Sequence, residues 1–359
     1  MNNIAAIQEE LKRMGLDAVL ITDEKNQRYA VGFPFTDGAV LVSRKKAWLI
    51  TDSRYVEAAE KAAGDFAEIC LFHMGRNLTD WLRELIEKNN IKRLGAEEEK
   101  LSWARYRFYR HRLGMELEPA QQIFTRLRSS KNAEELKYMR EAQAISERAL
   151  EETLPLIRPG VSEREIAAEL VYRMLKYGSE GNSFDPIVIC GKKTSMPHGV
   201  PGDELIKEGD FVTMDFGSIK GGYCSDMTRT VAVGSAGDEM RNVYDIVLKA
   251  QLTAIKKARA GIRGCDIDKT ARDVIAGAGY GEYFGHGFGH SLGLDIHEWP
   301  AASPSCRDIM PAGAVVSAEP GIYIPGKFGV RIEDVLILRE GGCEDITKAP
   351  KELIILKNS

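Results

Sequence analysis

Four carboxylates interrupt stretches of this sequence that are otherwise apolar enough to form buried β-strands. They are Asp215 in FVTMDFG, Asp226 in YCSDMTRTVAVG, Glu319 in AVVSAEPG and Glu333 in GVRIEDVLIL. Removing an ionised carboxylate from water is costly unless the protein supplies a partner. A single acid on a strand is commonly explained by an edge position, a nearby turn or a neighbouring arginine. Four acids in such strands favour a shared cationic partner.

The spacing of these acids predicts two hairpins. Asp215 and Asp226 are symmetric about the turn-like segment IKGG, and Glu319 and Glu333 are symmetric about the PGK turn. Directly opposed residues of antiparallel strands have Cβ atoms about 5 Å apart, so two like charges there repel each other. Two such hairpins predict a site for two divalent cations about 3.5–4 Å apart. The adjacent Asp334 is expected on the opposite face of its strand, at the surface or behind the ligands.

Three of the six histidines fall in one glycine-rich stretch, FGHGFGHSLGLDIHEWP. Glycines let the backbone pass close to a site, and an imidazole shifts the metal preference of an acidic site toward manganese, iron, cobalt or zinc. The stretch lacks the last glycine of a dinucleotide fingerprint, and the chain has no HExxH zinc motif. His198, in SMPHGVPGD, lies upstream of the first acidic strand and on its own indicates only an exposed loop.

A chain of 359 residues is expected to form two domains. Residues 1–124 alternate helical and strand patterns, which predicts a small α/β domain. Asn132 and Glu135 have the spacing of a capping box and predict the start of a long helix. Within residues 125–359, two pairs of helical patterns each precede a group of strands, which indicates an internal duplication in an α+β domain.

The composition argues against several classes of function. A net charge of −4 gives no general attraction to nucleic acid or to an anionic membrane, so the segment RYRFYRHR is expected to be a solvated helix face. No apolar run is long enough to cross a bilayer, and the N-terminal segment does not read as a signal peptide. Six single cysteines without a CxxC motif indicate reduced thiols. We therefore expect a cytoplasmic protein whose partners include neither nucleic acid nor membrane.

The ordered motifs MDFG, SDMTRT, GHGFGHSLGLDIHE, SAEPGIY and GVRIED resemble the pita-bread metallopeptidases. That family contains Xaa-Pro aminopeptidases, Xaa-Pro dipeptidases (prolidases) and methionine aminopeptidases. The first third of the chain is similar to the N-terminal domain of the creatinase/prolidase type, which methionine aminopeptidases usually lack. The resemblance implies an α+β pita-bread catalytic domain over residues 125–359, preceded by a creatinase/prolidase-like α/β domain over residues 1–124.

The resemblance also implies a site for two divalent metal ions per subunit. Asp226 and Glu333 would bridge both ions, Asp215 would complete the first, and His290 with Glu319 would complete the second. All of these positions are intact, so a loss of the metal site as in creatinase is not indicated. Oxygen-rich coordination with one imidazole favours manganese, with cobalt, iron and zinc as alternatives.

Five further roles follow from the same resemblance. His297 would stabilise the tetrahedral intermediate of peptide hydrolysis, as an oxyanion donor does. Glu319 would carry a proton to the leaving prolyl nitrogen. His198 and His286 would shape the pocket for proline, and Arg331 would lie beside the bridging glutamate.

The implied activity is hydrolysis of the N-terminal Xaa-Pro bond of peptides by a homodimeric Xaa-Pro aminopeptidase. An Xaa-Pro dipeptidase on the same scaffold is the first alternative. Some dipeptidases carry arginine directly after the HE-x-P element, where this chain has Ala301, and the ending ITKAPKELIIL also resembles the aminopeptidase branch. A non-catalytic pita-bread binding protein is the alternative of a different class, although such homologues typically lose metal ligands.

Overall fold

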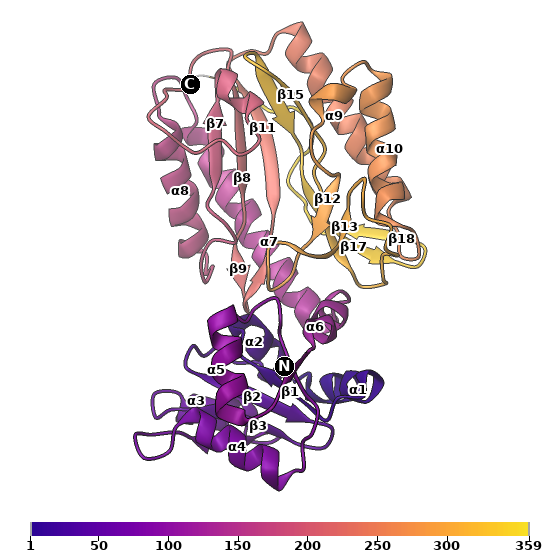
Figure 1. Cartoon of the computed structure of the whole chain (residues 1–359). Coiled ribbons are helices and arrows are strands. Elements are labelled where there is room, and N and C mark those ends of the chain that lie inside the picture. Colours follow the sequence, from indigo (N-terminus) through magenta and orange to yellow (C-terminus); the bar gives the residue numbers. More distant parts are fainter. Residues whose placement is uncertain (1, 358–359) are drawn as a thin grey trace. The chain divides into compact units, whose positions relative to one another are not determined.

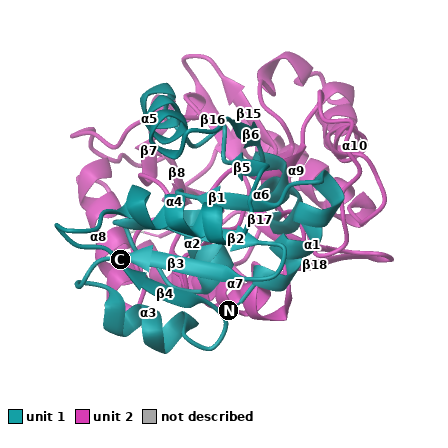
Figure 2. Ribbon diagram, turned by 60° about the horizontal axis from the view of Figure 1, so that its bottom comes forward, with its two compact units in different colours: residues 1–128 teal, residues 129–359 magenta. Residues whose placement is uncertain are grey.

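The structure, a computed structural model, describes residues 2–357 and comprises two compact units (Figure 1, Figure 2). The first unit ends at Arg128 and the second begins at Ser129. The boundary expected after residue 124 falls inside helix α6 (Gln121–Arg128). This helix belongs to the first unit because it packs against α1 (Ile4–Met14).

The first unit is built on a six-stranded mixed sheet in the order β4-β3-β2-β1-β5-β6. Its strands are β1 (Ala18–Ile21), β2 (Gly38–Ser43), β3 (Ala47–Thr51), β4 (Glu68–Leu71), β5 (Leu94–Ala96) and β6 (Leu117–Pro119). Its remaining helices are α2 (Glu24–Val31), α3 (Val56–Ala63), α4 (Leu78–Lys88) and α5 (Trp103–Leu113). The segment RYRFYRHR lies on α5, where Tyr109 is its one buried residue, so the expectation of a solvated helix face is confirmed.

The second unit repeats one pattern twice, two helices followed by antiparallel strands. The first repeat contains α7 (Ala133–Thr153), α8 (Glu163–Lys176), β7 (Ile187–Cys190), β8 (Phe211–Phe216), β9 (Ile219–Lys220), β10 (Tyr223–Cys224) and β11 (Met227–Val233). The second contains α9 (Asp238–Lys257), α10 (Gly264–Gly277), β12 (Gly289–Ser291), β13 (Glu298–Ala302), β14 (Val315–Ala318), β15 (Gly321–Ile324), β16 (Phe328–Arg331), β17 (Asp334–Arg339) and β18 (Gly342–Asp345).

The main sheets of this unit have the orders β19-β11-β8-β7 and β13-β12-β14-β17-β18, where β19 is Ile355–Leu356. Short 3₁₀ turns η1 (Leu154–Leu156), η2 (Gly191–Ser195) and η3 (Gly281–Tyr283) join elements. The capping box predicted from Asn132 and Glu135 is present at the start of α7. Within residues 2–357, no helix combines the length and the apolar character needed to span a bilayer.

Asp215 and Asp226 do not oppose each other as the sequence spacing predicted. Thr228 lies opposite Asp215 in the pairing of β8 with β11, and Asp226 precedes Thr228 by two residues. The hairpin turns at Gly221 and Gly222, whose φ angles are 58° and 80°. A two-residue type I′ turn needs positive φ at both of its central residues, and this pair of glycines supplies it. The turn therefore shifts the register, but an offset of two residues leaves both acids on the same face.

Glu319 and Glu333 occupy matched positions of the second hairpin, as predicted. The pairs β14–β17 and β15–β16 follow one continuous register about Gly326. The two acids lie in the gap between these paired stretches. There the backbone N–H of Glu319 donates to the carbonyl of Phe288, and that of Glu333 donates to the carbonyl of Thr228. At the two acids, therefore, the strands of the hairpin do not pair with each other and instead hydrogen-bond to the segments that contain Phe288 and Thr228.

The Gly221–Gly222 turn should be sensitive to a side chain. A Cβ on Gly221 would lie 2.5 Å from the ring of Tyr138 in addition to requiring a φ of +58°. We expect Gly221→Ala to lower the free energy of unfolding by about 2–4 kcal/mol. Gly209→Ala, at φ +83° with no neighbour within 4 Å of the new Cβ, should cost about 1 kcal/mol. Scanning calorimetry compares the two, and equal losses would show that Tyr138 does not constrain the turn.

Candidate metal centre

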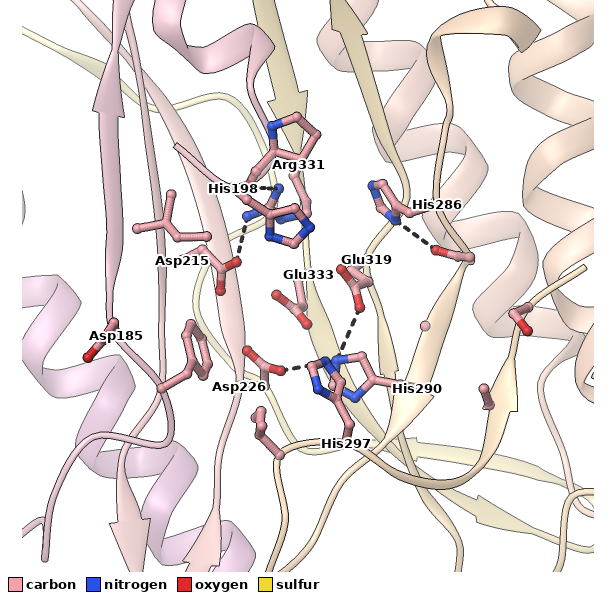
Figure 3. A pocket seen from close by; sticks show the side chains of 18 residues that line it. Asp185, His198, Asp215, Asp226, His286, His290, His297, Glu319, Arg331 and Glu333 are labelled. Carbon is pink, nitrogen blue, oxygen red and sulfur yellow. Dashed lines mark hydrogen bonds and ion pairs between the residues drawn. The ribbon is translucent and has the colours of Figure 1, made fainter. Parts of the chain in front are cut away.

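All nine residues predicted for the site line one pocket of the second unit, with a volume of about 610 Å³ (Figure 3). The acids come from the two hairpins described above, and the histidines come from the loop before β8 and from the glycine-rich stretch around β12. The lining residues from the prediction are His198, Asp215, Asp226, His286, His290, His297, Glu319, Arg331 and Glu333. The sequence therefore located the pocket correctly, while the individual roles stay predictions.

Asp226, His290 and Glu333 form one group of potential metal ligands. One ligating atom from each lies within 4.8 Å of the others. The Nε2 atom of His290 is 3.5 Å from Oδ2 of Asp226 and 3.3 Å from Oε1 of Glu319. Its Nδ1 atom is 3.2 Å from the carbonyl oxygen of Ser291, which assigns the ring proton to Nδ1. The lone pair of Nε2 therefore faces the carboxylates, the orientation that a metal-binding imidazole needs.

Burial and mutual repulsion raise the pKa of three of the carboxyl groups. For Asp226 the largest cause is burial, followed by the charges of Glu333 and Asp215. Burial also comes first for Glu333, followed by the charges of Glu319 and Asp215. The pKa of Glu319 is likewise raised by its burial. The interior thus opposes ionisation of these groups unless positive charge enters the pocket.

Arg331 supplies one positive charge inside this group. Its Nη2 atom donates to Oδ2 of Asp215 at 2.5 Å, and its Nε atom donates to the hydroxyl of Thr228 at 3.0 Å. Thr228 in turn donates to Oε2 of Glu333 at 2.7 Å. The guanidinium is only 4% exposed, so it compensates one acid and fixes the orientation of a second.

The remaining acceptors fit divalent cations. The Oδ1 atoms of Asp215 and Asp226 are buried and have no hydrogen-bond partner among the described residues. Ionised carboxylates and the Nε2 lone pair of His290 are acceptors only, so they cannot satisfy one another. A pocket that gathers such groups around one positively charged arginine has the donor set of a metal site.

Tyr323 is a site residue that the sequence analysis missed. Its hydroxyl accepts a hydrogen bond from Nη1 of Arg331 at 2.9 Å and lies 2.9 Å from Nε2 of His286. The Nδ1 atom of His286 lies 2.9 Å from the carbonyl of Gly287, so Nδ1 carries the proton and Nε2 accepts from the tyrosine. Burial lowers the pKa of His286. The sequence did contain an indication of Tyr323, because in the motif SAEPGIY this polar ring follows Glu319 on an inward-facing strand.

Asp334 is buried and paired, so of the two expected positions, at the surface or behind the ligands, the structure has the second. Its Oδ1 atom accepts from Nη2 of Arg229 at 2.8 Å, and its Oδ2 atom lies 2.5 Å from Nζ of Lys351. Nη1 of Arg229 also donates to the backbone carbonyl of Glu333 at 2.6 Å. The ion pair of Asp334 and Arg229 therefore holds the backbone at Glu333 in place from the side opposite the pocket.

A second buried ion pair supports the loop that carries His297. Nζ of Lys131 lies 2.9 Å from Oε2 of Glu298, and the two side chains are 1% and 6% exposed. Oε1 of Glu298 accepts from the backbone N–H of Asp295 at 3.2 Å. A Cβ on Gly293 would lie 2.6 Å from the same carboxylate. The chain between residues 293 and 298 thus folds around this carboxylate, which fixes the position of its neighbour His297.

Buried carboxylates that converge with the imidazole of His290 in one pocket of an α+β domain indicate an enzyme of the metal-dependent class. The chain belongs to metallopeptidase family M24, which its residues 137–340 match, and residues 3–130 match the creatinase/prolidase N-terminal domain. The expected pita-bread fold of the second unit and the creatinase/prolidase type of the first are thereby confirmed. Membership of this family also confirms that the protein is a peptidase that depends on divalent metal ions.

Proteins of known structure share the whole architecture. An Xaa-Pro dipeptidase from Bacillus anthracis is 43% identical, with a TM-score of 0.95 over 99% of both chains. An X-Pro aminopeptidase from Thermotoga maritima MSB8 is 38% identical, with a TM-score of 0.91 over 96% of this chain and 99% of that one. An uncharacterized peptidase of Bacillus subtilis is 42% identical over 345 residues, which cover 96% of this chain and 97% of the relative.

Breaking the ion pair behind His297 should destabilise the second unit. Lys131→Met leaves the buried carboxylate of Glu298 without its cation, and we expect a loss of about 3–5 kcal/mol in the free energy of unfolding. The matched control is Lys269→Met, which breaks an exposed i,i+4 pair with Asp273 and should cost no more than about 0.5 kcal/mol. Urea unfolding measures both, and similar small losses would contradict a supporting role for Lys131.

Divalent metal should stabilise the metal-free protein through the carboxylates. After EDTA treatment and dialysis, adding Mn²⁺ at about 100 times its dissociation constant is expected to add about 2.7 kcal/mol. The increase should vanish in Asp226→Asn and persist in Asp203→Asn, because Asp203 is exposed and pairs with Arg164 outside the pocket. Calorimetric transition temperatures with and without Mn²⁺ provide the measurement. An unchanged metal response in Asp226→Asn would remove Asp226 from the site.

Proposed function

We propose that the protein is an Xaa-Pro aminopeptidase, which hydrolyses the N-terminal Xaa-Pro bond of peptides longer than a dipeptide. This choice rests on the lining of the pocket. Of the described residues that line it, Arg331 is the only lysine or arginine. Its guanidinium already binds Asp215, Thr228 and Tyr323. A dipeptide would bring its carboxylate directly after proline, and no uncommitted cation in the lining receives it.

The named specificities of the relatives support cleavage at Xaa-Pro bonds. The Bacillus anthracis relative is an Xaa-Pro dipeptidase, and the Thermotoga maritima relative is an X-Pro aminopeptidase. The dipeptidase remains the second candidate because that relative is 43% identical to this chain. Intact carboxylates and histidines in one pocket favour either activity over a non-catalytic binding role.

The proposed metal ligands are Asp215, Asp226, His290, Glu319 and Glu333, arranged for two divalent ions per subunit. Four carboxylates with one imidazole support manganese, with cobalt, iron and zinc as alternatives. Bound divalent ions would supply Lewis-acid polarisation and a water of lowered pKa. Asp226 and Glu333 are proposed to serve both ions, as the resemblance implies, and a ligand atom of each lies within 4.8 Å of the other.

The remaining side chains are proposed to handle the peptide. His297 is an exposed residue of the pocket lining with its ring centroid 4.2 Å from that of His290, a place from which it can donate to the carbonyl oxygen of the scissile bond. Glu319 is held by the hydroxyl of Ser317 at 3.0 Å and is proposed to carry the proton to the prolyl nitrogen. His198 and His286 are proposed to contact the proline ring.

The imide bond before proline gives the basis for selection. Proline has no N–H and a fixed φ, so its amide differs in shape and donors from any other peptide bond. The ring of His286 presents a wall to the pocket whose two nitrogens are already bonded, Nδ1 to the carbonyl of Gly287 and Nε2 to the hydroxyl of Tyr323. Such a wall accepts an apolar ring and offers no acceptor for the N–H of an ordinary residue.

We also propose a homodimer, on the resemblance to the family alone. Light scattering after size-exclusion chromatography tests this state directly. A mass of one chain at micromolar concentration would contradict it.

Substrate length tests the proposed activity. After EDTA treatment and reloading with Mn²⁺, we expect kcat/KM for Ala-Pro-Ala to exceed that for Ala-Pro by at least about tenfold, because the unpaired carboxylate of the dipeptide disfavours its binding. The released amino acid is quantified by chromatography. Hydrolysis of the dipeptide alone would establish the dipeptidase instead. Absence of any prolyl hydrolysis with less than one metal bound per chain would favour a binding protein.

A further inference from the structure

A second cavity, with a volume of about 530 Å³, adjoins the pocket of the proposed active site. The two share Pro197, His198 and His286 in their linings. The second cavity extends away from these shared residues to η3, which contributes Glu282 and Tyr283. Figure 3 shows His198 and His286 on the same side of the cluster of acids, so the shared wall lies to one side of the proposed metal site.

The lining of this second cavity carries negative charge without a basic counterpart. Among the described residues, Glu282 is the one carboxylate that lines this cavity, it is exposed, and no lysine or arginine lines the cavity. The nearby Lys327 is engaged with Glu239 at 2.8 Å. The rest of the lining of the second cavity includes Tyr283, Tyr323 and two prolines. Aromatic faces beside a carboxylate suit a long cationic side chain, whose stem packs on the rings while its head meets the acid.

We propose that this cavity binds the peptide residue that follows proline, and that Glu282 selects lysine or arginine there. The inference rests on the proposed function, in which His198 and His286 contact the proline ring. A peptide chain leaving that ring passes between these histidines into the cavity that they share. Glu282 also repels a free carboxylate at this point, which disfavours dipeptides and favours longer basic peptides.

The test varies one residue of a short peptide amide. Ala-Pro-Lys-Ala, Ala-Pro-Gln-Ala and Ala-Pro-Glu-Ala amides are hydrolysed by the Mn²⁺-loaded enzyme at low salt. We expect kcat/KM for lysine to exceed that for glutamate by about tenfold, since attraction and repulsion each contribute a few-fold, and the ratio should fall as salt screens the charges. In Glu282→Gln the ratio should fall to about twofold or less, and Glu282→Lys should invert it.

A matched control and a binding measurement separate the outcomes. Glu340→Gln removes an exposed carboxylate between β17 and β18, outside both cavities, and should keep the wild-type ratio. The product-like peptides Pro-Lys-Ala and Pro-Glu-Ala amide have no Xaa-Pro bond to cleave and, titrated by calorimetry into the Mn²⁺-loaded enzyme, should show the same order of affinity. Equal rates for all three substrates, or a preference that survives in Glu282→Gln, would overturn the inference. Failure to cleave any prolyl peptide would instead overturn the proposed function.

Discussion

The carboxylates in the low-dielectric pocket repel one another, and the surrounding residues of the second unit must compensate this repulsion. Arg331 offsets part of it by binding Asp215 and, through Thr228, by orienting Glu333. The Oδ1 atoms of Asp215 and Asp226 have no hydrogen-bond partner within residues 2–357. The fold therefore assembles a site whose ionised carboxylates need divalent ions as partners, and metal binding is expected to stabilise the folded pocket.

Much of this site could be predicted from residue types in a strand pattern. Buried acids are costly, so their appearance in apolar strands indicates a function, and the symmetric spacing of Glu319 and Glu333 gave the correct register. The spacing of Asp215 and Asp226 gave the wrong one, because the two positive-φ glycines at Gly221 and Gly222 set the centre of the turn. Turn chemistry, not symmetry of the acids, decides where a hairpin folds.

Other parts depend on contacts between distant segments and could not be predicted from local pattern. Asp334 is buried because Arg229 and Lys351 reach it from separate strands and loops. The pair Lys131 and Glu298 joins residues 167 positions apart. Tyr323 gains its role from Arg331 and His286 together. A single sequence shows which residues are chemically unusual, but pairing over such separations follows from the packed structure.

The shared register on either side of Glu319 and Glu333 restricts how this hairpin can change in length. Side chains of a strand alternate between faces, so one extra residue absorbed by either arm would turn Glu333 and Arg331 away from the pocket. Two residues, one in each arm, would lengthen the tip beyond Ile324 and Phe328 and leave the acids in place. Natural homologues with longer or shorter tips should accordingly differ there by even numbers of residues, because only such changes keep Glu333 and Arg331 on the face of the pocket.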